Sequence, residues 1–219
     1  EVAGTIWDKM YPFPINHIGK FLERIVYLVY RNCEIWAISE STKRDILKIN
    51  PNLKIKIIPL GIDISKFKPA TKFNFPSALF VARLVKMKGI ESALRAAREI
   101  SKNLPKFKLF VVGDGDLGYV QELKDYVNSN HLQKNVEFLG KVSDQQRNTL
   151  YAKSHFLIHS SFKEGFGLTV LEAAASGTPT IAKKGSSMDE LIVNDETGLL
   201  FDDDRQIATL FLKYFGNKE

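Results

Sequence analysis

The sequence predicts a doubly wound α/β fold for residues 76–219, with helices on both faces of a parallel, Rossmann-like sheet. Short and almost wholly apolar segments alternate there with amphipathic ones, as buried strands alternate with covering helices. The clearest amphipathic segment spans residues 90–104. Its apolar side chains recur every three or four positions and share one helical face: Ile90, Ala93, Leu94, Ala97, Ile100 and Leu104.

Six apolar segments are the expected strands of this sheet. They cover residues 78–82, 109–112, 136–139, 156–159, 180–182 and 199–201. In the common strand order, the first and fourth strands are neighbours, and ligands bind beyond their carboxyl ends, where the winding direction reverses. We therefore expect Arg83, after the first strand, to face the loop at Glu164, after the fourth.

Residues 1–75 predict only the end of a second, incomplete α/β domain on the N-terminal side. The expected loop, helix, strand, helix and strand cover residues 1–17, 18–31, 35–38, 39–49 and 55–58. Residues 63–76 contain two prolines and little periodicity, which indicates a linker. We place the domain boundary between residues 75 and 76.

Composition and charge limit the classes of function. The chain is 44% hydrophobic and 26% charged, typical of soluble globular proteins, and no apolar run is long enough to span a bilayer. Residues 1–75 hold 12 Lys/Arg and 7 Asp/Glu, or +5 of the formal net charge of +6. These cations form no dense run and no recognition motif, which argues against a nucleic-acid partner.

Residues 20–31 fit a membrane-surface helix or a helix with a broad buried face, and we favour the buried helix.

The single cysteine and the histidines carry no predicted chemistry. Cys33 excludes an internal disulfide and fits a reducing compartment, so we expect a cytoplasmic protein with a buried, inert thiol. The four histidines show no paired spacing for a metal. No metal site and no cofactor are expected.

The segment from Glu164 to Glu172 combines two carboxylates with a Gly-x-Gly turn and a helix that is expected to begin at about Leu168. The first amides of a helix have no intrahelical partner and bind anions, while carboxylates accept hydrogen bonds from hydroxyls. A phosphorylated ligand with sugar hydroxyls fits both features. The alternative is a plain turn with a helix cap and a solvated acid.

Other strand ends supply cations and glycines at the same edge of the sheet. Arg83 and Lys88 follow the first strand, where they could clamp a phosphate or be solvated surface cations. Gly113 ends the second strand in a loop that only loosely resembles a dinucleotide loop. The segment ending at Val142 follows the third strand, and its backbone could line a base pocket or form a simple turn.

Together these residues resemble the retaining glycosyltransferases of the large glycogen-synthase-like group, which have the two-domain GT-B fold. The resemblance covers roughly residues 35–201. It rests on Ile57-Ile58-Pro59-Leu60-Gly61-Ile62-Asp63, Phe67-Lys68-Pro69, Ala82-Arg83-Leu84, Lys88-Gly89, Val112-Gly113-Asp114-Gly115, Phe138-Leu139-Gly140-Lys141-Val142, Glu164-Gly165-Phe166-Gly167, Glu172-Ala173 and Gly177-Thr178-Pro179.

The resemblance implies a nucleotide-diphosphate sugar as donor substrate, held mainly by residues 76–219. It implies that Glu164 contacts the transferred sugar near its reacting carbon and that Glu172 binds the ribose hydroxyls. The remaining donor-binding residues that it implies, for diphosphate, sugar and base, are Arg83, Lys88, Gly113, Val142, Gly165, Phe166, Gly167, Leu168 and Thr169.

The expected function is transfer of a hexose, with retention, to a glycan or lipid-linked acceptor. Because one domain is incomplete, we expect a fragment of such an enzyme that could bind donor without transferring it. The alternatives are a nucleotide-sugar binding module without turnover and a GT-B nucleotide-sugar epimerase. The basic N-terminal third also suggests peripheral contact with the inner membrane surface.

Overall fold

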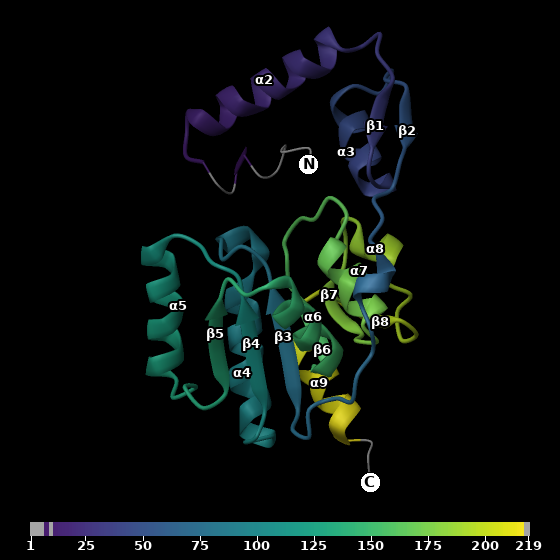
Figure 1. Cartoon of the computed structure of the whole chain (residues 1–219). Coiled ribbons are helices and arrows are strands. Elements are labelled where there is room, and N and C mark those ends of the chain that lie inside the picture. The colour runs from purple at the N-terminus through teal and green to yellow at the C-terminus, as the bar shows by residue number, and fades with distance from the viewer. Residues whose placement is uncertain (1–6, 9–10, 217–219) are drawn as a thin grey trace.

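The computed structural model describes residues 7–8 and 11–216. A six-stranded parallel sheet lies at the centre of its larger, C-terminal part (Figure 1). The six predicted strands are confirmed to within one residue at each end. They are β3 (Ser77–Val81), β4 (Lys108–Val112), β5 (Val136–Gly140), β6 (Phe156–His159), β7 (Thr180–Lys183) and β8 (Gly198–Phe201).

The strand order is β5-β4-β3-β6-β7-β8, so the predicted pairing of the first and fourth strands, β3 and β6, is confirmed. Ala78 lies opposite Phe156 and Leu79 opposite Leu157 in this parallel pair. From β3 the chain winds outward through β4 and β5, and from β6 through β7 and β8. The carboxyl ends of β3 and β6 therefore flank the switch point at which such sheets bind ligands.

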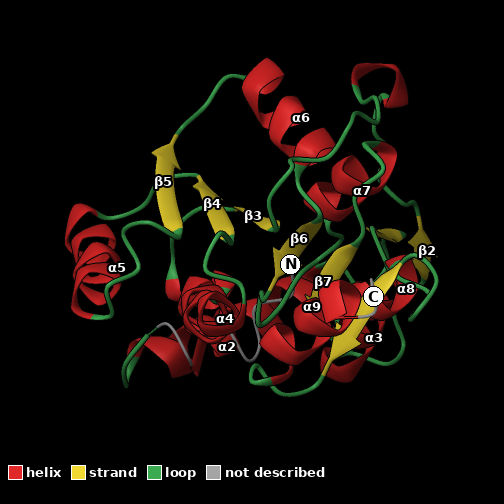
Figure 2. Cartoon of the chain, turned by 90° about the horizontal axis from the view of Figure 1, so that it is seen from below, coloured by secondary structure: helices red, strands yellow, loops and turns green. Residues whose placement is uncertain are grey.

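Helices cover both faces of the sheet, which confirms the doubly wound fold (Figure 2). Alternate strand residues point to opposite faces, so Phe80 packs in one core cluster and Leu79 in the other. The helices on the Phe80 face are α4 (Ile90–Asn103), α5 (Leu117–Ser129) and α9 (Gln206–Gly216). Those on the Leu79 face are α6 (Asp144–Lys153), α7 (Leu168–Ala175) and α8 (Met188–Leu191).

The predicted amphipathic face of α4 is buried against the sheet and α9. Ile90, Ala93, Ala97 and Ile100 are fully buried, and burial of each large aliphatic side chain stabilises the fold by about 1.5–3 kcal/mol. Leu104, at the C-cap, packs against the edge of the same cluster. This face positions the loop before α4, which carries Lys88.

In the part of the chain that the structure describes, the N-terminal residues form the helices α2 and α3 and a two-stranded parallel sheet. A small core of Ala37, Ile46 and Leu53 holds it together. Its elements are α2 (Ile15–Val29), β1 (Ile35–Ala37), α3 (Glu40–Ile49) and β2 (Ile55–Ile57). The helix and strand predictions for residues 18–31, 35–38, 39–49 and 55–58 are confirmed, with shifts of up to three residues at their ends.

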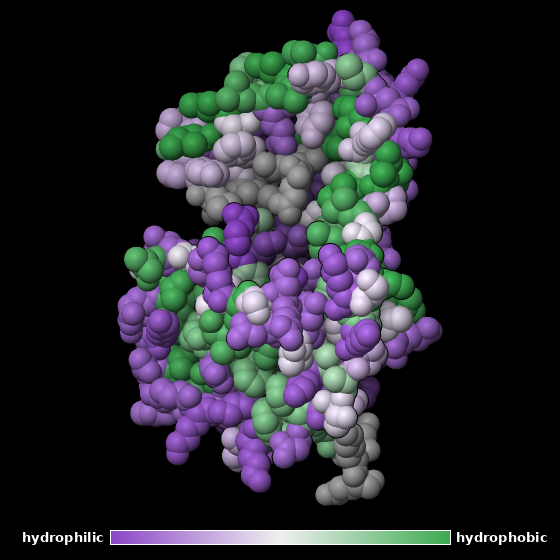
Figure 3. Space-filling view, viewed as in Figure 1, coloured by the Kyte–Doolittle hydropathy of each residue, from purple (hydrophilic) through white to green (hydrophobic). Residues whose placement is uncertain are grey.

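Two expectations about this part are wrong. Gly19 is the one described residue of α2 that is buried, while Phe21 and Val29 are 63% and 69% exposed, and Figure 3 shows apolar side chains gathered over this helix. Cys33, in the turn after α2, is also exposed. Among the described residues of α2, Tyr27 is the one that packs against the small core of Ala37, Ile46 and Leu53, so that core leaves the rest of the apolar face uncovered.

The predicted linker packs along the sheet as it descends from β2 to β3 (Figure 1). Phe67 is buried in the core of the Leu79 face, and Phe73 and Phe75 pack against it. The rings of Phe73 and Phe75 stack with centroids 5.0 Å apart. Two short 3-10 turns, η1 (Ile64–Lys66) and η2 (Lys86–Lys88), lie on either side of β3. The division between residues 75 and 76 stays a prediction.

The glycines at the carboxyl edge provide a test of this packing. Gly113 has φ of +127°, and a Cβ there would lie 1.9 Å from the carbonyl oxygen of Ala82, whereas Gly140 has φ of +64° in open space. Gly113→Ala should lower the free energy of unfolding by about 2–4 kcal/mol, and Gly140→Ala by about 1–2 kcal/mol. Urea unfolding measures both. Gly61→Ala, with no close neighbour, is the control, and equal effects at all three glycines would contradict the close approach of β3 and β4.

Candidate functional site

The loop after β6 and the first turn of α7 form the centre of the site. The helix begins at Leu168, as predicted, with Gly167 as its N-cap at φ +103°. No side chain caps this end, and the first amides of any helix lack intrahelical partners. The amides of Leu168 and Thr169 are thus available to a negatively charged group at the positive end of the helix dipole.

Neighbouring segments hold the loop in place. The amide of Glu164 donates to Oγ of Ser186 at 3.3 Å, and Oγ of Ser187 donates to the carbonyl of Glu164 at 3.2 Å. A Cβ on Gly167 would lie 2.5 Å from the methyl carbon of Met188 in α8. The second glycine of the motif is therefore required for its backbone angle, while the flexible end of the Met188 side chain could move away from a Cβ.

Glu164 forms an ion pair with Lys88 across the switch point. Nζ of Lys88 lies 2.6 Å from Oε2 of Glu164, and both side chains are more than four-fifths buried. The ring Nε2 of His159, at the end of β6, lies 3.5 Å from the same oxygen. The prediction that the β3 and β6 ends would meet is confirmed by this contact, but Lys88 makes it and Arg83 does not.

These two neighbours keep Glu164 ionised. Burial of the carboxylate raises its pKa, but His159 and the positive charge of Lys88 outweigh burial and hold the pKa of Glu164 at about 2. Nδ1 of His159 is buried without a hydrogen-bond partner. An ionised carboxylate only accepts hydrogen bonds, so we assign the ring hydrogen of His159 to Nε2, which faces Glu164.

His159 is a site residue that the sequence reasoning missed. The available signal was its place at the carboxyl end of a wholly apolar strand, five residues before Glu164. A histidine without a paired ligand carried no metal signature, and its contact with Glu164 depends on how the loop folds back over the strand end.

A cleft of about 250 Å³ opens beside this ion pair. Seven of the predicted site residues line it, together with His159 and with Ile38 and Leu60 of the N-terminal part. The seven are Lys88, Glu164, Gly165, Phe166, Gly167, Leu168 and Thr169. The structure thus brings the predicted loop and one predicted cation to a single concave surface.

Four predicted residues lie at the same edge but outside this cleft. Arg83 follows β3 with an exposed side chain, and Gly113 follows β4, where its amide donates to the carbonyl of Gly140 at 2.8 Å. Val142 follows β5 and is half-buried. Glu172 lies one turn inside α7, and its Oε2 accepts a hydrogen bond of 2.8 Å from the hydroxyl of Tyr151.

The N-terminal part contacts the loop through α3. Thr42 donates to the carbonyl of Gly165 at 3.3 Å, and Lys163 forms an ion pair of 2.6 Å with Asp45. The amides of Glu40 and Ser41, at the start of α3, donate to the carboxylate of Glu190 in α8 at 2.9 and 2.6 Å. The Glu190 side chain of α8 thereby caps the N-terminal end of α3.

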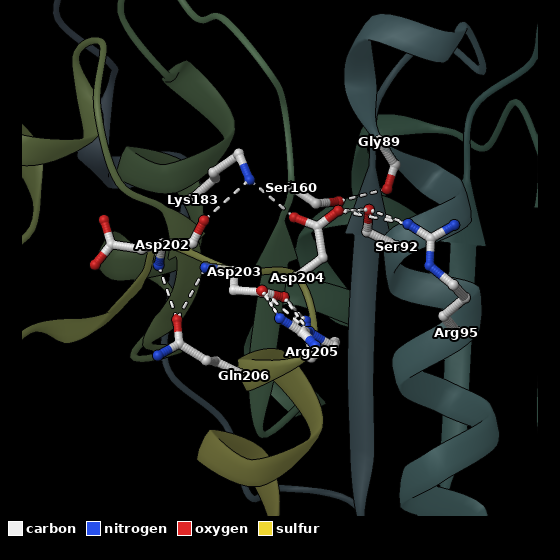
Figure 4. A network of polar contacts seen from close by, with 10 residues as sticks. All are labelled: Gly89, Ser92, Arg95, Ser160, Lys183, Asp202, Asp203, Asp204, Arg205 and Gln206. Carbon is white, nitrogen blue, oxygen red and sulfur yellow. Dashed lines mark hydrogen bonds and ion pairs between the residues drawn. The ribbon is translucent and has the colours of Figure 1, made fainter.

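Asp-x-Asp spacing, a pattern that can bind metal, occurs at Asp114–Asp116 and at Asp202–Asp204, and three of these four carboxylates, those of Asp114, Asp116 and Asp204, have other partners. Asp114 pairs with Lys141, and Asp116 caps α5. Figure 4 shows Asp204 between Lys183 on one side and Ser92 and Arg95 of α4 on the other. The described residues contain no group of three or more His, Cys, Asp or Glu side chains able to hold a metal ion.

The hydrogen bonds and ion pairs of Asp204 instead stabilise the segments that carry the site. They join the start of α9 to α4, and Oγ of Ser160 donates to the carbonyl of Gly89 at 2.7 Å beside them (Figure 4). Gly89 is the N-cap of α4 and directly follows Lys88. These contacts fix the strand ends that carry Lys88 and the Glu164 loop.

Comparison with known proteins finds a matching family. The family described as "Glycosyl transferases group 1" matches residues 62–215, which include the loop at Glu164 and the segment after β3 that carries Arg83 and Lys88. The chain belongs to this family. The N-terminal residues before 62 lie outside the match.

Individual relatives and structures support the family and the GT-B architecture. The chain is 30% identical over 199 residues to an uncharacterized glycosyltransferase of Methanocaldococcus jannaschii, covering 83% of this chain and 50% of that protein. It is 30% identical over 173 residues to alpha-monoglucosyldiacylglycerol synthase of Streptococcus pneumoniae, covering 72% of this chain and 39% of the synthase. Anabaena HepE, crystallised with UDP and glucose, shares the fold with a TM-score of 0.81 at 22% identity, over 92% of this chain and 59% of HepE. The chain spans half or less of the length of both sequence relatives.

The ion pair gives a pH-dependent prediction. Because the pKa of Glu164 is held at about 2, against an ordinary value of 4.5, its ionised form stabilises the protein by about 3 kcal/mol above pH 4.5, and this is lost as the pH falls towards 2. Lys88→Met should raise that pKa. The variant should be less stable than the original protein at pH 6, and the difference should narrow by pH 3.

Urea unfolding between pH 3 and pH 7 measures this difference. Lys86→Met, which removes an exposed lysine two residues away, is the matched control and should show a small difference that does not change with pH. A constant gap between the original protein and the Lys88 variant across this range would contradict the coupling of Lys88 to Glu164.

Proposed function

We propose that the cleft binds a nucleotide-diphosphate sugar and that the protein serves in transfer of its hexose. The observation that carries the proposal is the buried Lys88–Glu164 pair beside the uncapped start of α7. One side of the cleft offers positive charge and free amides to phosphate, and the other offers a carboxylate to hydroxyls. A diphosphate joined to a sugar satisfies both sides.

Each predicted residue then has a role in donor binding. Lys88 and Arg83 neutralise the diphosphate, and the amides of Gly167, Leu168 and Thr169 hold its distal phosphate. Gly165 and Phe166 shape the turn, and the strand ends at Gly113 and Val142 line the base. Glu172 accepts hydrogen bonds from ribose. HepE was crystallised with UDP and glucose, which supports this type of ligand.

For the reaction itself, we propose hexose transfer with retention to a glycan or lipid-linked acceptor. Glu164 stays ionised beside the sugar, where a fixed negative charge stabilises positive charge that develops at the reacting carbon. Lys88 and the amides of α7 stabilise the departing diphosphate. The S. pneumoniae relative, a glucosyldiacylglycerol synthase by name, supports a lipid-linked acceptor.

Binding of nucleoside diphosphates tests the donor site. Lys88→Ala and Arg83→Ala should each weaken binding of UDP or GDP by about 1.5–3 kcal/mol, because each removes a charge-assisted hydrogen bond. Isothermal titration calorimetry measures the affinities. Lys86→Ala is the control and should bind as the original protein does. A folded protein that binds no nucleoside diphosphate would refute the proposal.

We further propose that α2 makes peripheral contact with an anionic membrane. No described helix has both the length and the apolar character needed to cross a bilayer. Yet α2 exposes Phe21, Leu22 and Val29, and Lys20 and Arg24 belong to the same helix. Apolar side chains flanked by cations suit the boundary between acyl chains and acidic headgroups.

Flotation with liposomes that contain an anionic lipid tests this contact. The protein should float with the liposomes, and the double substitution Phe21→Glu and Leu22→Glu should leave it in the dense fraction. Leu117→Glu, which changes an even more exposed apolar residue on α5, should not alter flotation. Retention of the original protein in the dense fraction would contradict membrane contact.

A further inference from the structure

Tyr151 lies behind the proposed ribose site and makes a single side-chain hydrogen bond. Its side chain, on α6, is fully buried in the core of the Leu79 face. The hydroxyl donates to Oε2 of Glu172 at 2.8 Å. Burial and the negative charge of Glu172 raise the pKa of Tyr151, so the hydroxyl keeps its hydrogen and remains a donor.

The main chain of Tyr151 is fixed as well. Its carbonyl accepts a short hydrogen bond from the hydroxyl of Thr178, which also lies 3.2 Å from the carbonyl of Ser154. Lys72, from the linker, donates to Thr178 and to the carbonyl of Ala152. Thr178, from the Gly-Thr-Pro segment, therefore ties the end of α6 to the start of β7 and to the linker.

The hydrogen bond from Tyr151 makes the two carboxylate oxygens of Glu172 differ in their partners. Oε2 accepts the hydrogen bond from the Tyr151 hydroxyl and lies 3.8 Å from Nε of Arg147, while no hydrogen bond or ion pair joins Oε1 to a described residue. A carboxylate can accept several hydrogen bonds, so Oε1 remains available to hydroxyls of a ligand. The side chain of Glu172 is 17% exposed, which leaves a small accessible face.

Arg147 is the competing donor for this carboxylate. Its Nη1 pairs with Asp144 at 2.9 Å, but its Nε is buried without a hydrogen bond. Without the Tyr151 hydroxyl, rotation of Glu172 towards Nε of Arg147, 3.8 Å away, would give a hydrogen-bond acceptor to this buried N–H, which is costly to leave unpaired. That rotation would change where Oε1 points.

We propose that Tyr151 is a positioning residue that holds Glu172 with one oxygen directed at the ribose hydroxyls of the bound nucleotide. This inference rests on the proposed donor site and adds to it a residue that does not itself contact the ligand. It also gives the Gly-Thr-Pro segment a physical task, because Thr178 anchors the backbone of Tyr151.

The test compares ligands with and without a complete ribose. Tyr151→Phe should bind UDP about tenfold more weakly, as expected for loss of a hydrogen bond to a charged group, and should bind pyrophosphate as the original protein does. The preference of the original protein for UDP over 2′-deoxy-UDP should shrink in the variant. A purely structural role would not change this preference. Calorimetry measures all three ligands, and thermal unfolding confirms that each protein is folded.

Tyr119→Phe is the matched control, because the hydroxyl of Tyr119 donates to Glu91 in another Tyr–Glu pair of the same domain. It should leave all three affinities unchanged. If Tyr151→Phe does not fold, Thr178→Val, which frees the Tyr151 carbonyl, should weaken UDP binding and spare pyrophosphate.

The outcomes separate this inference from the proposed function. A folded Tyr151→Phe variant with unchanged UDP affinity, beside a Glu172→Gln variant that loses it, would overturn the positioning role and leave the donor site intact. Equal losses for UDP and pyrophosphate would also overturn it. Failure of the original protein to bind UDP, GDP or ADP would refute the donor site and this inference together.

Discussion

The parallel pairing of β3 with β6 places two strand ends side by side at the point where the chain changes its winding direction. Helices that follow these strands pack on opposite faces, so neither covers the space above their carboxyl ends. Lys88 comes from one side of that space and Glu164 from the other. This pairing therefore brings the charge pair and the start of α7 together beside one cleft.

Several elements hold the two largely buried charged side chains, Lys88 and Glu164, in place. Ser186 and Ser187 hold the backbone of Glu164, and the Asp204 network fixes the backbone around Gly89. Contacts with α3 add a third support from the N-terminal part. The loop therefore lies between two parts of the chain, and its shape depends on how α3 is docked against α8.

Much of the fold could be predicted because the strands are buried on both faces and the helices are amphipathic. The periodic apolar residues of α4 and the apolar run of β6 are local signals, and they correctly predicted a helix and a buried strand. The predictions that α2 and Cys33 are buried were wrong. An apolar side chain in the sequence favours burial, but the sequence pattern does not show whether another element packs against it. Whether the chain supplies such a neighbour is decided by the elements around it.

By itself, the sequence determined the α/β class, the strand positions, the turn at Gly167 and the residues that resemble a glycosyltransferase donor site, because periodicity and short motifs are properties of neighbouring residues. Only the tertiary structure decided that Lys88, and not Arg83, pairs with Glu164. It also placed His159 beside that pair and Tyr151 beneath Glu172. These contacts join residues on different elements, so their geometry depends on strand order and on the packing of α6 and α7, which no local pattern encodes.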